Sequence, residues 1–160
     1  MIKLIGICIL LFTSMLISGE LVSRRRHRLV LCEELLRFVS YIRLQIGCFL
    51  RPIPEVVGSF CSDEFNKCGF LPEVSDADLA ACFVSSDVPK LVGTECSRIM
   101  ESLFSSLGTG YLEDEIKLID VHRAQLTELV ERERAETVRQ VRLIRTLAGS
   151  ASLGLVIFII

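Results

Sequence analysis

Thiol and imidazole side chains are the groups in this sequence best suited to nucleophilic or metal chemistry. The chain has seven cysteines, at positions 8, 32, 48, 61, 68, 82 and 96, and two histidines, His27 and His122. A structural zinc site needs closely spaced pairs of such ligands, and the sequence has no C-x-x-C pair. We therefore interpret the cysteines as reduced thiols that pack as small apolar side chains, in a reducing compartment. A cysteine–histidine hydrolase that uses His122 with Cys96 or Cys82 stays open as an alternative.

The common motifs of nucleotide binding and hydrolysis are missing from the sequence. It has no G-x-x-x-x-G-K-[ST], G-x-G-x-x-G, G-x-S-x-G or H-E-x-x-H pattern. Gly108-Thr109-Gly110 is not followed by the lysine of a phosphate loop, so we interpret it as the end of a helix. Glu113, Asp114 and Glu115 are adjacent, and adjacent helical residues point in different directions, which does not suit an acid–base pair. The sequence predicts no catalytic residue, no metal site and no cofactor, and hence a protein that is not an enzyme.

The composition combines high hydropathy with many charges. Of the 160 residues, 51% are hydrophobic and 24% are charged, and the mean hydropathy is +0.50. A disordered chain, a collagen and a disulfide-stapled toxin all fit this balance poorly. The net charge of −2 argues against a general nucleic-acid-binding protein. We expect one domain, with the apolar residues gathered into blocks.

An apolar block opens the chain. Leu4 to Val22 is almost wholly apolar, and as a helix these nineteen residues would be about 28 Å long, close to the thickness of a bilayer core. The basic residues that follow directly are Arg24, Arg25, Arg26 and Arg28. Such a cluster holds the next part of the chain in the cytoplasm, so we predict a transmembrane helix over residues 1–23. A cleaved signal peptide is the alternative, but the small-x-small pattern of its cleavage site is poor here.

A second apolar block closes the chain. Residues 147–160 carry no charge, and the arginines that precede them are Arg139, Arg142 and Arg145. Because fourteen residues are short for a span, we predict a transmembrane helix over residues 143–160, with Arg145 reaching the interface. Both termini then lie across the membrane, and residues 24–142 are cytoplasmic. A C-terminal helix buried in a soluble core is the alternative.

Residues 24–142 show helical spacing of apolar side chains almost throughout. We expect breaks at residues 51–54, residues 69–72, Gly93 and Gly108, with residues 75–78 capping the helix that follows them. One long helix then follows from about residue 111, and its expected apolar face comprises Leu112, Ile116, Ile119, Leu126, Val130, Val138, Val141 and Ile144. The predicted fold class is all-α, a small antiparallel helical bundle between the two transmembrane helices.

Charge is distributed unevenly along the chain. Residues 24–28 carry a net charge of +4, residues 131–145 carry +2 and residues 60–120 carry −8. The two basic stretches border the predicted transmembrane helices, so we expect their arginines to orient the protein against anionic lipid headgroups. The acidic stretch would face the cytoplasm and bind a partner, with Glu113, Asp114 and Glu115 as candidate contacts. Alternatively, the acids only keep the domain soluble.

The complete layout resembles a known bacterial family. Met1-Ile2-Lys3-Leu4-Ile5-Gly6 opens the first apolar block, Arg24 to Arg28 follow it, and Ser106-Leu107-Gly108 precedes the long charged helix, which ends in a glycine-spaced apolar tail. In these features the chain resembles stage III sporulation protein AB of endospore-forming bacteria.

This resemblance implies a two-span protein of the mother-cell membrane that surrounds the forespore. It also implies about six helices in the cytoplasmic domain, similar to the inner-membrane platform proteins of type II secretion and type IV pili. The partners implied are a secretion-type ATPase, stage III sporulation protein AA, and the other membrane proteins of a channel. A generic two-span membrane adaptor outside sporulation stays an alternative.

Overall fold

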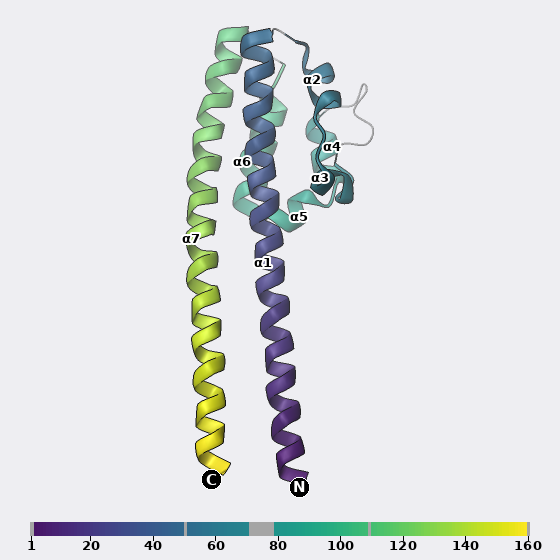
Figure 1. The fold of residues 1–160 in the computed structure, drawn as a ribbon. Coiled ribbons are helices and arrows are strands. Elements are labelled where there is room, and N and C mark those ends of the chain that lie inside the picture. Colours follow the sequence, from purple (N-terminus) through teal and green to yellow (C-terminus); the bar gives the residue numbers. More distant parts are fainter. Residues whose placement is uncertain (1, 50, 71–78, 109, 160) are drawn as a thin grey trace. The chain divides into compact units, whose positions relative to one another are not determined.

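All regular structure in the described part of the chain is helical, which confirms the all-α prediction (Figure 1). The computed structural model describes residues 2–49, 51–70, 79–108 and 110–159, and within them the side chains of residues 19–144 and 146. The helices in these ranges are α1 (Ile2–Phe49), α2 (Ile53–Ser59), α3 (Asp63–Lys67), α4 (Leu79–Ser85), α5 (Val88–Val92), α6 (Thr94–Ser106) and α7 (Leu112–Ile159).

Prolines separate the first helices where the sequence predicts. Helix α1 runs through the arginine cluster without a break, and α2 begins after Pro52, whose extended backbone (φ −64°, ψ 143°) cannot continue a helix. Pro54 lies in the first turn of α2, where its missing N–H costs no hydrogen bond. Helix α3 is capped by Ser62, whose hydroxyl accepts a hydrogen bond from the backbone N–H of Phe65.

Glycines separate the later helices. Gly93, between α5 and α6, has φ +87° and ψ 164°, a backbone conformation that glycine alone adopts readily. Gly108, after α6, also has φ +87°. The predicted breaks at both glycines are therefore confirmed. The predicted cap of α4, residues 75–78, and part of the break at residues 69–72 lie outside the described residues.

Helix α7 is a single helix of 48 residues, as its lack of proline predicts. It begins after Tyr111, whose backbone carbonyl accepts hydrogen bonds from the N–H groups of Asp114 and Glu115, both at 3.0 Å. Three acidic residues occupy its first turn, where the positive end of the helix dipole favours them.

Packing divides the chain into two units, residues 1–27 with residues 132–160, and residues 28–131. Helices α1 and α7 contribute to both units. Among the residues with described side chains, no helix is long and apolar enough to cross a membrane. The predicted transmembrane helices, residues 1–23 and 143–160, fall mostly on residues whose side chains lie outside that description.

Phenylalanine side chains from separate helices and loops form the centre of the core in residues 28–131. The ring of Phe38 in α1 is fully buried, and its centroid lies 4.9 Å from that of Phe60, 5.8 Å from Phe65, 5.9 Å from Phe70 and 6.1 Å from Phe104. Most of these pairs are tilted or edge-to-face, the geometry that aromatic rings prefer. The cluster fixes α1 against the short helices that follow it.

Helical spacing predicts part of the remaining core. The buried residues at the spaced apolar positions are Cys32, Val39, Ile42, Ile46, Leu79, Phe83, Met100, Leu103, Ile119, Leu126 and Val130. Two residues of the expected apolar face of α7 are exposed instead, Leu112 at 41% and Val138 at 57%. Leu112 is the first residue of its helix, and Val138 lies in the unit that only parts of α1 and α7 form, which leaves much helix surface uncovered.

Candidate functional site

The three candidate acids lie where α1 ends and α7 begins. A methyl group on Gly47, near the end of α1, would lie 3.8 Å from Cδ1 of Ile116, in the second turn of α7. The two helix ends are therefore adjacent within residues 28–131. Glu113 and Asp114 are exposed there, and Glu115 is half-buried. Oδ1 of Asp114 also lies 3.8 Å from Nζ of Lys117, so a partner that binds here meets a lysine beside the acids.

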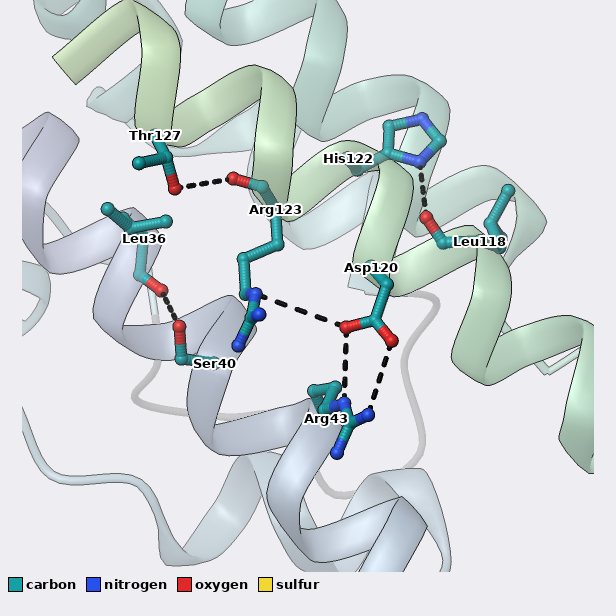
Figure 2. Close-up of polar contacts among 8 residues, drawn as sticks. All are labelled: Leu36, Ser40, Arg43, Leu118, Asp120, His122, Arg123 and Thr127. Atoms are coloured by element: carbon teal, nitrogen blue, oxygen red, sulfur yellow. Dashed lines mark hydrogen bonds and ion pairs between the residues drawn. The ribbon is translucent and has the colours of Figure 1, made fainter. Parts of the chain in front are cut away.

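An ion pair joins α1 to α7 close to this end of the domain (Figure 2). The guanidinium of Arg43 donates to Asp120 through Nε (3.1 Å to Oδ1) and through Nη2 (3.2 Å to Oδ2). Nε of Arg123 lies 4.0 Å from the same Oδ1. The hydrogen bond from Arg43, together with the charges of both arginines, holds the pKa of Asp120 below its usual value. This bidentate pair is compatible with one register of the two helices.

Three exposed large apolar side chains lie at the ends of these two helices, and the sequence did not identify them as part of a site. Phe49 is 61% exposed, Tyr111 is 86% exposed and Leu112 is 41% exposed. We call these three residues together with Glu113, Asp114 and Glu115 the α1–α7 end. Periodicity assigns Leu112 to the core and Tyr111 to a helix boundary, so only the position of both beside the acids could have indicated this surface.

The predicted membrane-orienting arginines divide between the two units. Arg24, Arg25 and Arg26 are exposed in the unit of residues 1–27 and 132–160, and Nε of Arg24 pairs with Glu20 at 3.0 Å. Arg139 and Arg142 are exposed in the same unit. The side chain of Arg145 lies outside the described residues.

Arg28 takes a different role from its neighbours. It belongs to the unit of residues 28–131 and is half-buried. A methyl group on Gly93 would lie 2.8 Å from Nη2 of Arg28 and 2.9 Å from its Cζ. The guanidinium therefore packs directly on the backbone between α5 and α6, which is a position inside the domain.

The cysteines with described side chains form no disulfide. Cys32, Cys68 and Cys96 are buried, Cys82 is half-buried, and Cys48 and Cys61 are exposed. Burial raises the pKa of the Cys68 thiol, and the nearby carboxylates of Glu64 and Asp87 raise it further. This thiol is therefore protonated at neutral pH and unreactive.

His122 packs between α6 and α7. Its side chain is buried, Nδ1 lies 2.9 Å from the carbonyl oxygen of Leu118 (Figure 2) and Nε2 lies 3.4 Å from the hydroxyl of Ser102. In the neutral ring, Nδ1–H donates to the carbonyl and Nε2 accepts from Ser102. Both nitrogens are engaged with a backbone carbonyl and a hydroxyl, an arrangement that suits a packing role.

A hollow of about 300 Å³ opens beside α3. Its lining consists of Glu34, Arg37, Cys61, Ser62, Asp63 and Glu64. Glu34 accepts hydrogen bonds from Ser62 (3.2 Å) and Arg37 (3.3 Å). In the described part of the chain, no group of histidine, cysteine and acidic side chains is arranged to hold a metal ion.

No protein-family model, curated protein or solved structure matches this chain. The surface that combines exposure, charge and adjacency of two helices is the α1–α7 end, and we take it as the candidate functional site.

Proposed function

We propose that this chain is a sporulation membrane platform protein. It helps to assemble a secretion-like channel between mother cell and forespore, and it docks a secretion-type ATPase. The observation that carries the proposal is the length of α1 and α7, 48 residues each. At ~1.5 Å per residue each is about 72 Å long, more than twice the ~30 Å of a bilayer core. Each helix thus has enough residues to form part of the helical domain and also to cross a membrane.

The sequence of both outer segments supports membrane insertion. Leu4 to Val22 and residues 147–160 are apolar, and each is bordered on its inner side by arginines. In this proposal the arginines face the cytoplasm and bind anionic lipids. Both termini lie on the other side of the membrane, and residues 24–142 are cytoplasmic.

The resemblance to stage III sporulation protein AB supports the platform role. It places the protein in the mother-cell membrane around the forespore, with the other channel membrane proteins as neighbours. Its ATPase partner is stage III sporulation protein AA, which is cytoplasmic and so meets the cytoplasmic domain. In this proposal the protein acts by binding and not by catalysis.

Reversing the charge of Glu113, Asp114 and Glu115 to lysine should weaken binding of this ATPase. We expect roughly tenfold lower affinity at low salt and a smaller difference at higher salt, because exposed charges act mainly through screened, long-range attraction. Titration of the full-length chain in lipid nanodiscs against the ATPase, at two salt concentrations, measures both quantities.

A matched control uses Glu128, Glu131 and Glu136, which are exposed on the same helix. Reversing these three charges changes the net charge by the same amount but should preserve most of the affinity for the ATPase. Unchanged affinity and unchanged salt dependence after reversal of the three candidate acids would reject this docking surface.

A further inference from the structure

The two packing units of the chain carry opposite net charge. Residues 1–27 and 132–160, which we call the terminal unit, hold nine lysines and arginines and three acidic residues, a net charge of +6. Residues 28–131 hold nine lysines and arginines and seventeen acidic residues, a net charge of −8. The packing of α1 with α7 thus joins two separate basic stretches of the sequence into one cationic unit. A unit of this charge attracts an anionic partner.

Four arginines of the terminal unit are exposed and have no polar partner among the residues with described side chains. They are Arg25 and Arg26 in α1, and Arg139 and Arg142 in α7. Arg24 is exposed as well, but its Nε lies 3.0 Å from Oε1 of Glu20, and this ion pair offsets its charge. The four guanidiniums without such a partner present planar donors that match the oxygens of a phosphate group.

Arg28 ends the same basic stretch but has a different environment. It is half-buried in the unit of residues 28–131, and a methyl group on Gly93 would lie 2.8 Å from its Nη2. A guanidinium in contact with the backbone between α5 and α6 cannot at the same time extend to an external phosphate. The structure therefore separates Arg28 from the arginines that can bind an anion, although the sequence groups them together.

Exposed leucines of the terminal unit favour a lipid bilayer over a nucleic acid as the anionic partner. Leu21, close to Arg25, is 55% exposed, and Leu143, next to Arg142, is 50% exposed. A bilayer takes such leucines among its acyl chains while the neighbouring arginines reach the phosphates, whereas a nucleic acid would leave the leucines in water. Both leucines lie on the side of the arginines that leads into the apolar segments of the two helices.

We propose that the four arginines of the terminal unit without a polar partner bind the phosphate groups of anionic lipids, and that Arg28 and the Arg24–Glu20 pair do not. The inference rests on the proposed function and deepens it, because it assigns the lipid contacts to particular side chains. Each helix then contributes two guanidiniums to the bilayer surface, on the cytoplasmic side of its apolar segment.

The test measures binding of phosphatidylglycerol, an anionic lipid, to the full-length chain in detergent micelles by native mass spectrometry. Replacing any one of the four arginines by glutamine, as in Arg25→Gln, should weaken this binding about threefold, and replacing all four should weaken it about tenfold or more. The affinity for phosphatidylcholine, which has no net charge, should not change. Higher salt should reduce the difference between the wild type and the variants, because it screens the attraction.

Two control variants separate direct contacts from net charge. Arg28→Gln removes one positive charge, as Arg25→Gln does, but should leave phosphatidylglycerol binding within about twofold of the wild type. It should instead lower the denaturation midpoint, because it removes a side chain that packs inside the domain. The double variant Glu20→Gln/Arg24→Gln removes both members of the ion pair without changing the net charge and should bind like the wild type.

Unchanged affinity of the fourfold variant, or equal weakening by Arg25→Gln and Arg28→Gln, would overturn the assignment. Tighter binding of a DNA duplex than of phosphatidylglycerol would overturn the choice of a bilayer as the partner. Recovery of the wild-type chain in the soluble fraction of the cells would instead overturn the proposed function, and this inference with it.

Discussion

Replacing Phe38 by alanine should lower the free energy of unfolding by about 3–5 kcal/mol. Phe38 is fully buried, and its ring lies within 6.1 Å, between centroids, of four other phenylalanines. Truncation would leave a cavity bordered by rings from residues 60–70 and from α6, so collapse around it is limited. The denaturation midpoint, followed by the reaction of the buried thiols of Cys32 and Cys96 with a fluorescent maleimide, measures the loss.

Phe49→Ala provides a control within the same helix. Phe49 is 61% exposed, and its truncation should cost less than about 0.5 kcal/mol. Equal effects of the two substitutions on stability would contradict the aromatic core described here.

Replacing Gly93 by alanine should lower the free energy of unfolding by about 1–3 kcal/mol, because its backbone angles are those that only glycine adopts without strain. Its φ is +87° and its ψ is 164°. The added methyl would also approach Nη2 of Arg28 to 2.8 Å. Since a guanidinium is the flexible end of a long side chain, it can move, and the backbone contributes most of the cost.

Two comparisons separate these contributions. Gly58→Ala, in α2, meets no atom within 4 Å and should be neutral or slightly stabilising, since alanine favours a helix over glycine. In an Arg28→Ala background the contact with the guanidinium is gone, and most of the loss at Gly93 should remain. If Gly93→Ala caused no loss of stability in the Arg28→Ala background, the contact with the guanidinium would instead account for most of the cost.

The sequence predicts the helical elements well because prolines and glycines act locally. Pro52, Gly93 and Gly108 interrupt the helices through their own backbone angles, whatever packs around them. The spacing of apolar residues by three and four positions likewise identifies the buried side of α6, including Leu103. These features need no knowledge of which segments meet.

Contacts between distant segments are what the sequence does not predict. Arg43 and Asp120 are 77 positions apart, and their pairing depends on the antiparallel register of α1 and α7. The contact of Arg28 with Gly93 cannot be predicted either, because the sequence shows only a basic cluster of the kind that borders a transmembrane helix. For the candidate site, the acids stand out through net charge, but the approach of the end of α1 to the start of α7 depends on how the two helices pack.

We propose that two long helices hold a cytoplasmic helical domain at a membrane, and labelling of Cys61 tests this proposal most directly. Cys61 is exposed, in contrast to Cys68, which is buried and whose pKa is raised, so that its failure to react would carry no information on topology. The experiment uses the full-length chain with Cys61 as its single cysteine and a membrane-impermeant maleimide. A second chain carries its single cysteine appended after residue 160.

We expect Cys61 to react only after the cells are permeabilised, and the appended cysteine to react in intact cells. Reaction of Cys61 in intact cells would contradict the proposed topology, because the domain and its docking surface would then face away from a cytoplasmic ATPase.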